Sequence, residues 1–329
     1  MSLMKTLMAS ATVLSLSAMA ASAEPALLFD LGGKFDKSFN EAAYHGAERW
    51  AQETGGSYMD LEMQSEAQRE RALRTLADRG ANPIVMTGFA FSEVLTKVAP
   101  DYPDTRFVII DSVVEGDNIQ SNIFAEGEGS YLAGIMAATA SESGTLGFVG
   151  GMDIPLIRKF ACGYVQGIRA TNPEATIIQN MTGTTPAAWN DPVRGAELAR
   201  AQISQGADVI YAAAGGTGIG VLQAAADEGV LSIGVDSNQN HLHPGQVLTS
   251  VVKRVDNAVY DAFMAGADVE PGIKEWNVAN DGVWVSIDDD NAELVTDEMQ
   301  AAVDAAREAI ASGEIVVHDY MTDNSCPVE

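Results

Sequence analysis

Two aromatic and two acidic residues, each following a predicted strand, are of the types that bind a flat polar molecule. Phe39 and Trp189 offer π faces for stacking a heterocycle, a contact of about 1–3 kcal/mol per base in nucleic-acid complexes. Asp111 and Asp236 accept hydrogen bonds and therefore suit amino, imino or hydroxyl donors. Two carboxylates at one site argue against an anionic ligand. Together these residues favour the binding of a neutral molecule that carries hydrogen-bond donors.

Each of these residues also has a purely structural interpretation. Phe39 could pack as a hydrophobic staple against the helix that follows it. Asp111 and Asp236 could be ordinary helix caps. The ligand-binding and the structural interpretation both stay open at this point. The strands and helices that position these residues are therefore considered next.

The first predicted strand is joined to the first predicted helix by a glycine turn. Residues 27–29 are continuously apolar, as in a strand buried on both faces of a parallel sheet. Glycines at 32–33 permit a tight turn, and Asp36 or Ser38 can cap a helix predicted at 40–53. In open α/β sheets, ligands bind at this edge, where strands end and helices begin.

Strand-like and helical segments alternate through the rest of residues 24–125. Strands are predicted at 83–88, 106–111, 113–114 and 119–124, and helices at 65–80 and 92–99. This alternation is typical of one doubly wound parallel sheet.

The same alternation begins again after residue 126. Strands are predicted at 145–149, 175–180, 207–213, 231–235 and 247–252, and helices at 130–139, 155–170, 192–205 and 218–228. A helix at 256–265 or a β-rich stretch at 276–286 could return the chain to the first lobe. A last helix is predicted at 291–312, capped by Asn291 or Asp290, and a strand-like segment is predicted after it at 315–317.

We therefore expect an α/β protein of two lobes, each a doubly wound parallel sheet flanked by helices. The first lobe would hold 24–125 and about 253–282, and the second would hold 126–252 and about 283–329. Chain crossings between such lobes place a ligand cleft between them and act as a hinge.

Residues 1–23 have the features of a secretory signal peptide. Lys5 precedes an apolar stretch too short to span a bilayer, and small residues end the segment. The predicted cleavage site after residue 23 is followed by Glu24 and not by a cysteine, so we expect a periplasmic protein without a lipid anchor. The formal net charge of −27 disfavours nucleic acid as a partner and favours a protein that stays monomeric.

Cys162 and Cys326 are the two cysteines of the chain. They could be unrelated small residues, but an oxidising compartment favours a disulfide between them. The polar tail around Cys326 has little else to hold it to the body, so we expect a structural bridge.

Other motifs in the chain are weak. The glycines at 216–220 follow a strand, but Val221 replaces the third glycine of a dinucleotide fingerprint. His241 and His243 lack further metal ligands nearby. Acidic residues 288–290 lack the glycine and glutamate of a calcium loop. We therefore expect no cofactor, no metal and no catalytic triad.

Several separated motifs, in the same order, resemble the basic membrane protein family of ABC transporter substrate-binding proteins, whose studied members include purine nucleoside receptors. The resemblance covers nearly the whole chain after residue 23. The matching stretches are Gly-Gly-x-x-Asp-Lys-Ser-Phe-Asn at 32–40, Gly-Phe-Ala-Phe at 88–91, Tyr-Pro-Asp-Thr-Arg-Phe at 102–107, Gly-Ser-Tyr-Leu-Ala-Gly at 129–134, Gly-Phe-Val-Gly-Gly at 147–151, Gln-Gly-Ala-Asp-Val-Ile at 205–210, Ala-Gly-Gly-Thr-Gly at 214–218, Ile-Gly-Val-Asp-Ser at 233–237 and Leu-Thr-Ser-Val-Val-Lys-Arg at 248–254.

The resemblance implies a type I periplasmic binding protein that captures a purine nucleoside for an ABC transporter permease. In that family the base would stack between the two aromatic residues and the ribose would meet acidic and basic groups. The residues implied to contact the ligand are Asp36, Phe39, Asn40, Asp111, Trp189, Gly215, Gly216, Asp236 and Lys253. Phenylalanine is more usual at 189 and aspartate at 238, so Trp189 and Asn238 depart from the family pattern.

Two other functions stay open. A nucleoside-processing enzyme could use aspartates at the same cleft, although the first strand end lacks a cluster of them. A binding protein for another flat heterocycle, such as a flavin, would use the same aromatic residues. Sequence also leaves open whether the protein serves transport or sensing.

Overall fold

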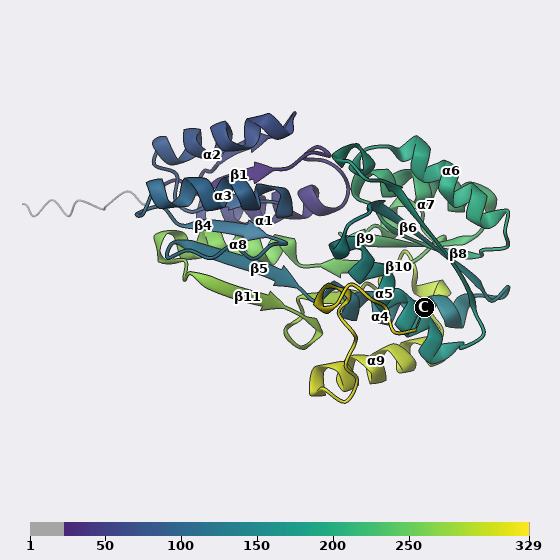
Figure 1. Ribbon diagram of the computed structural model, residues 1–329. Helices are drawn as coiled ribbons and strands as arrows, with labels where there is room; N and C mark the ends of the chain where they lie inside the picture. The colour runs from purple at the N-terminus through teal and green to yellow at the C-terminus, as the bar shows by residue number, and fades with distance from the viewer. Residues whose placement is uncertain (1–22, 329) are drawn as a thin grey trace, which may run out of the picture.

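The computed structural model describes residues 23–328 as two α/β lobes side by side (Figure 1). The signal peptide predicted at 1–23 lies outside the described residues apart from Ala23. Among the described residues, no helix is both long and apolar enough to cross a membrane.

The first lobe contains a parallel six-stranded sheet in the order β11-β5-β4-β3-β1-β2. Its strands are β1 (Ala26–Phe29), β2 (Met59–Glu62), β3 (Ile84–Met86), β4 (Phe107–Ile110), β5 (Ile119–Phe124) and β11 (Gly272–Trp276). Its helices are α1 (Phe39–Thr54), α2 (Arg69–Asp78), α3 (Ser92–Val98) and α8 (Val255–Ala265). Residues of β1 and β4 have no exposed surface, which explains their continuous apolar sequence.

The second lobe contains a six-stranded sheet in the order β12-β10-β9-β8-β6-β7. Its strands are β6 (Thr145–Met152), β7 (Thr176–Gly183), β8 (Val209–Ala213), β9 (Leu231–Asp236), β10 (Val247–Lys253) and β12 (Val283–Val285). Its helices are α4 (Glu126–Ala140), α5 (Pro155–Thr171), α6 (Pro192–Ile203), α7 (Gly218–Glu228) and α9 (Asp297–Ser312). Only β12 is antiparallel to its neighbour among the described strands.

The chain passes between the lobes three times along the described residues. It leaves the first sheet after β5, returns after β10 through α8 and β11, and leaves again before β12. Helix α8 packs against α1, and a Cβ at Gly46 of α1 would lie 2.1 Å from the Asp256 carbonyl oxygen. We propose that the lobe boundaries fall at these crossings.

Helices α4 and α5 touch through their backbones. A Cβ at Gly167 would lie 2.0 Å from the Tyr131 carbonyl oxygen, and one at Gly163 would lie 2.2 Å from that of Gly127. Side chains at the amino ends of both helices are therefore held close together, beside the ends of β5 and β10.

Four sequence-based predictions of local structure are wrong. Residues 113–114 form no strand, because the Val114 backbone bonds to the Ser121 hydroxyl instead of a neighbouring strand. The helix predicted at 130–139 begins earlier, at Glu126. The last helix begins at Asp297 and is capped by Thr296, not by Asn291 or Asp290. Residues 315–317 are not a strand either.

The C-terminal tail (residues 313–328) returns to α5, as the yellow segment in Figure 1 shows. Cys162 of α5 and Cys326 of the tail form a disulfide, with their Cα atoms 5.6 Å apart. Gln166 of α5 adds two hydrogen bonds, one accepted from the His318 N–H and one donated to the His318 carbonyl. The tail is thus attached to the second lobe by covalent and polar contacts.

Candidate ligand-binding site

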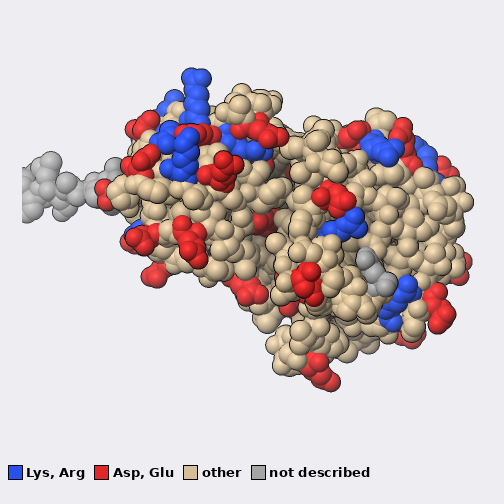
Figure 2. Space-filling view, in the orientation of Figure 1, with Lys and Arg blue, Asp and Glu red and all other residues tan. Residues whose placement is uncertain are grey.

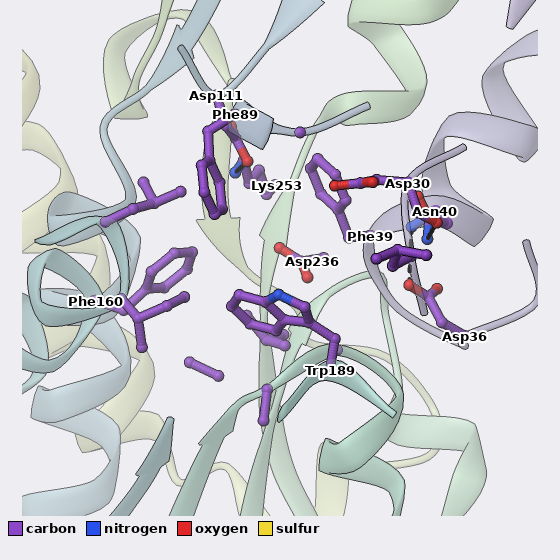
Figure 3. A pocket seen from close by; sticks show the side chains of 18 residues that line it. Asp30, Asp36, Phe39, Asn40, Phe89, Asp111, Phe160, Trp189, Asp236 and Lys253 are labelled. Carbon is purple, nitrogen blue, oxygen red and sulfur yellow. Dashed lines mark hydrogen bonds and ion pairs between the residues drawn. The ribbon is translucent and has the colours of Figure 1, made fainter. Parts of the chain in front are cut away.

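A cavity of about 670 Å³, including the space open to solvent at its mouth, lies between the two lobes at the carboxyl ends of β1, β4, β9 and β10. Small-molecule sites commonly have this size. The lining residues, shown in Figure 3, are Asp30, Leu31, Asp36, Phe39, Asn40, Gly88, Phe89, Asp111, Leu156, Ile157, Phe160, Trp189, Ala213, Ala214, Gly215, Val235, Asp236 and Lys253. The structure therefore brings together all the ligand residues implied by the sequence except Gly216.

Asp111 and Asp236 occupy matching positions in the two lobes. Asp111 follows the last residue of β4, and Asp236 is the last residue of β9. Both have left-handed backbone angles, with φ of 69° and 63°, a conformation that costs energy in residues other than glycine. The folded sheets hold this strain, and it turns both carboxylates toward the cavity (Figure 3).

One carboxylate oxygen of Asp111 lacks a hydrogen-bond partner among the described residues. Its Oδ2 accepts a hydrogen bond from Lys253 Nζ at 2.6 Å. Its Oδ1 is buried and has no hydrogen-bond partner among the described residues. Buried polar atoms are nearly always hydrogen-bonded, so this oxygen marks a place where a bound molecule would supply a donor.

Lys253 is the cation at the base of the cavity. Its side chain is 2% exposed and its Nζ lies 2.6 Å from Asp111 and 2.9 Å from Glu126. The Nζ atom also lies 5.1 Å from the Phe39 ring centre and 5.8 Å from that of Phe160. Burial works to lower the pKa of Lys253, but the neighbouring carboxylates raise it above its ordinary value, so the ammonium stays charged.

The acidic groups around the cavity are less acidic than free aspartate. Burial raises the pKa of Asp236, against the lowering effects of Lys253 and the Ser38 hydroxyl. Burial also raises the pKa of Asp111, although Lys253 opposes this. Asp30 differs in having Arg69 as its own partner, at 2.8 Å.

Aromatic residues from both lobes face the cavity. Phe39 is the first residue of α1, and Trp189 ends the short 3-10 turn Pro186–Trp189 in the second lobe. Both are partly buried, pack against the hydrophobic core and line the cavity. A Cβ at Gly151 would lie 2.2 Å from Cζ3 of Trp189, so glycine there makes room for the indole.

Asp36 and Asn40 organise the turn that carries Phe39. Asp36 caps α1 by accepting hydrogen bonds from the backbone N–H groups of Ser38, Asn40 and Glu41, whereas the Ser38 side chain makes no cap bond. The Asn40 amide donates to the carbonyls of Asp30 and Gly33. Both amide hydrogens of Asn40 are thus used within the protein, and its contact with a ligand stays a prediction.

Hydrogen bonds join the lobes directly beside the cavity. The Ser38 hydroxyl donates to Asp236 Oδ2 at 2.6 Å, and the Ser237 hydroxyl donates to the Ser38 carbonyl at 2.8 Å. Gln239 Nε2 donates to the Lys37 carbonyl at 2.9 Å. These bonds hold the end of β9 against the start of α1, so the structure shows the lobes closed at this edge.

The glycine and asparagine residues singled out in the sequence have local structural roles. Gly215 has a φ of 55° and lies beside Trp189. Gly216 does not line the cavity, but a Cβ there would lie 3.2 Å from the Trp189 carbonyl oxygen. Asn238 donates to the Asp288 carboxylate and accepts from the Asn240 N–H, which fixes a loop outside the cavity.

Sequence reasoning missed Glu126 and Phe160. Glu126 is 1% exposed and lies between two lysines, with Lys253 at 2.9 Å and Lys159 at 3.0 Å. It was overlooked because the helix was expected to begin at residue 130. Acidic residues are enriched in the first turn of helices, so Glu126, two residues after the predicted strand at 119–124, could have been identified as a helix start. Phe160 of α5 is buried in the hydrophobic core and also lines the cavity.

The described residues can be compared with the weak metal and dinucleotide motifs of the sequence. No group of three or more His, Cys, Asp or Glu side chains within residues 23–328 could hold a metal ion. Val221, at the third position of the glycine fingerprint, has no exposed surface and packs in the core of the second lobe. Figure 2 shows acidic side chains spread over both lobes, with most lysines and arginines on that face lying beside them.

The two sheets and the cavity between them define a type I periplasmic-binding-protein fold. A solute-binding protein of an ABC transporter from Aeropyrum pernix K1 has this fold, with a TM-score of 0.82 and 29% sequence identity over 90% of this chain and 94% of that chain. One from Conexibacter woesei gives a TM-score of 0.73 at 25% identity, over 91% and 99% of the two chains.

Residues 23–320 match the family described as "ABC transporter substrate-binding protein PnrA-like", and the chain belongs to this family. The ABC transporter nucleoside-binding protein BmpA of Lactococcus lactis is 31% identical, over 89% of this chain and 88% of the relative. Basic membrane protein A of Borreliella afzelii is 30% identical, over 89% and 91%. A relative from Pyrococcus abyssi, 35% identical over 79% and 68%, is named a lipoprotein.

Proposed function

We propose that this substrate-binding protein captures a purine nucleoside outside the cytoplasm and delivers it to an ABC permease. The observation that carries the proposal is Asp111, which lines a cavity together with aromatic rings and whose buried Oδ1 has no hydrogen-bond partner among the described residues. A purine offers N–H donors at its edge and a flat face for stacking, so it meets both requirements.

Each residue of the site then has a role. Phe39 and Trp189 stack on the two faces of the base, and Asp111 accepts a hydrogen bond from its edge beside Asn40. Asp236 accepts from the ribose hydroxyls, and Lys253 donates to a ribose oxygen. Gly215 and Gly216 let the backbone come close to the sugar, and Asp36 holds the turn that positions the first stacking residue.

The charge of the cavity supports a nucleoside without phosphate. Asp36, Asp111, Asp236 and Glu126 are buried around the cavity, and Lys253 is the basic residue in its lining. A phosphate would add negative charge to this cluster in a medium of low dielectric, where repulsion between like charges is strong. The printed name of the Lactococcus lactis relative is consistent with this ligand class.

Ligand identification and calorimetry test the proposal. Protein purified without added ligand is denatured, and the supernatant is examined by mass spectrometry. Guanosine, inosine and adenosine are then titrated into refolded protein, with guanosine monophosphate as the matched control. We expect a purine nucleoside in the supernatant and binding of nucleosides in preference to the nucleotide. Recovery of a flavin, or conversion of nucleoside to free base at a catalytic rate, would contradict the proposal.

The wider assignments belong to the same proposal. We propose a monomeric protein that acts outside the cytoplasm, because it belongs to a family of transporter binding proteins. Light scattering of the purified protein tests the monomer. The expectation that the exported protein lacks a lipid anchor stays a prediction, and relatives named lipoproteins make membrane fractionation the direct test.

A further inference from the structure

A row of charged side chains with alternating sign leads from the cavity to the C-terminal tail. It begins at Asp111, whose carboxylate lies 2.6 Å from Lys253 Nζ. Lys253 lies 2.9 Å from Glu126, and Glu126 lies 3.0 Å from Lys159 Nζ. Lys159 in turn lies 3.3 Å from Asp319 of the tail. Asp111 and Lys253 line the cavity, whereas the other three residues do not.

The inner members of the row are buried. Glu126 is 1% exposed and Lys159 is 11% exposed, whereas Asp319 is 44% exposed. A buried charge is tolerated only with a partner of opposite sign or with hydrogen bonds. Burial favours the neutral form of Glu126, yet Lys159 and Lys253 lower its pKa below the ordinary value, so the carboxylate is charged.

Lys159 is held on every side by oxygen atoms. Its ammonium donates to the Phe124 carbonyl at 2.7 Å and also lies near the carboxylates of Glu126 and Asp319. Three oxygens thus surround a group with three hydrogens. Of the two carboxylates that pair with Lys159 among the described residues, Glu126 is the one that also pairs with Lys253, a residue of the cavity lining.

The tail supplies the last charge of the row. The disulfide between Cys162 and Cys326 and the hydrogen bonds between Gln166 and His318 fasten the tail to α5, the helix that carries Lys159. Asp319 lies between these attachments and caps the short 3-10 turn Tyr320–Thr322. The attachment of the tail therefore determines where Asp319 lies.

We propose that Glu126, Lys159 and Asp319 are positioning residues of the ligand site, which act by setting how strongly Lys253 pairs with Asp111. Glu126 and Asp111 both pair with Lys253, so each weakens the pairing of the other. Lys159 also pairs with Glu126, which leaves Lys253 more strongly paired with Asp111. Asp319 pairs with Lys159 and so weakens the pairing between Lys159 and Glu126. The ligand in this inference rests on the proposed function, but the coupling between the five charges does not.

Because the charges alternate in sign, the removal of each one should move the titration of Asp111 in a predictable direction. Without Lys159, Glu126 has Lys253 as its remaining cation, so Asp111 loses part of its partner and its titration moves to higher pH. Without Asp319, Lys159 satisfies Glu126 more fully, so the titration of Asp111 moves to lower pH. General loosening of the fold would not produce opposite directions.

Other ionisable groups face this row and stay constant in the comparison. Asp236 lies at the end of β9 near Lys253, and Asp36 lies near Asp236. Glu128 of α4 lies near Lys159, and Glu275 of β11 lies near Glu128. None of these groups is altered in the variants proposed below.

Carbon-13 NMR of aspartate carboxyl groups in the ligand-free full chain tests the coupling. Asp111→Asn identifies the Asp111 signal, and its titration midpoint is measured in wild type, Lys159→Met and Asp319→Asn. Lys97→Met, which removes an exposed ion pair with Glu70, is the matched control. We expect the midpoint to move up by about 0.5 or more on the pH scale in Lys159→Met, down in Asp319→Asn, and not at all in the control.

An unchanged or lowered midpoint in Lys159→Met would overturn the inference. If Lys159→Met does not fold, Asp319→Asn tests the coupling by itself, because Asp319 is half-exposed on the tail and its replacement should leave the fold intact. An unchanged or raised Asp111 midpoint in Asp319→Asn would show that Asp319 does not act on Asp111. Inosine titration below the Asp111 midpoint provides a separate readout, in which Lys159→Met binds about three-fold more weakly and Lys159→Arg recovers much of the loss. Wild-type protein that binds no nucleoside would refute the proposed function but leave the NMR comparison decisive for the coupling.

Discussion

Replacing Trp189 with alanine removes the aromatic wall that the second lobe presents to the cavity. The indole is partly buried, packs against the core and fits over Gly151, where a Cβ would lie 2.2 Å from the ring. The ring is therefore held in place before a ligand arrives, so little ordering entropy offsets its stacking contact. Loss of one stacking face costs about 1–3 kcal/mol, which is about 5- to 150-fold in dissociation constant.

Three variants measured together separate stacking from general damage. Trp189→Phe keeps an aromatic face and is expected to lose less nucleoside affinity than Trp189→Ala. Gly151→Ala leaves the indole intact but pushes it out of place, so it is expected to weaken binding although it adds only a methyl group. Phe39→Ala removes the opposite face and should resemble Trp189→Ala.

Isothermal titration calorimetry with guanosine and inosine gives the affinities, and thermal unfolding without ligand shows whether each variant is folded. Unchanged affinity in both Trp189→Ala and Phe39→Ala, with folded protein, would refute the stacking argument. It would return Phe39 to the role of a helix staple alone.

Three further predictions concern the carboxylates and the disulfide. Asp236→Asn should weaken the binding of nucleosides more than the binding of free bases, because a carboxylate can accept hydrogen bonds from two hydroxyl groups and an amide oxygen from fewer. Equal losses of affinity in calorimetry would place Asp236 away from the ribose. Burial raises the pKa values of Asp111 and Asp236, and the hydrogen-bond donors of a ligand need the ionised carboxylates. Nucleoside affinity should therefore fall as the pH decreases, and the fall should begin at a higher pH than the ordinary pKa of aspartate. Affinity that is constant from pH 7.5 to about 4.5 would show that these carboxylates do not hold the ligand. Thiol labelling of denatured, unreduced exported protein should find no free cysteine, because the Cys162–Cys326 bridge closes a loop of 164 residues and stabilises by about 5 kcal/mol through chain entropy; two labelled thiols would contradict it.

The fold was largely predictable because its determinants are local and repeated. Continuous apolar runs such as 27–29 identified buried parallel strands, and helical periodicity between them fixed the α/β class. Predictions failed where a side chain or a distant segment decides the local structure. Val114 bonds to the Ser121 hydroxyl rather than to a strand, and the tail follows polar contacts with α5 rather than a sheet.

The residues of the site also divide into those that the sequence predicts and those that it does not. Residues at strand ends could be found from sequence, since the topology brings all such ends to one edge, and the structure places Asp111 and Asp236 there. The helix start marks Glu126, but its pairing with Lys159 could not be found, because that pairing depends on the contact between α4 and α5 and on a tail that is distant in sequence. A pattern in one segment carries no information on such a pairing.

The central claim is that this chain binds a purine nucleoside, and mass spectrometry of the molecule released from purified, denatured protein tests it most directly. We predict guanosine, inosine or adenosine in a near-stoichiometric amount, and its loss from protein in which Trp189 and Phe39 are both alanine. A different heterocycle recovered from wild-type protein, or an equal amount of nucleoside released from the double variant, would contradict the account.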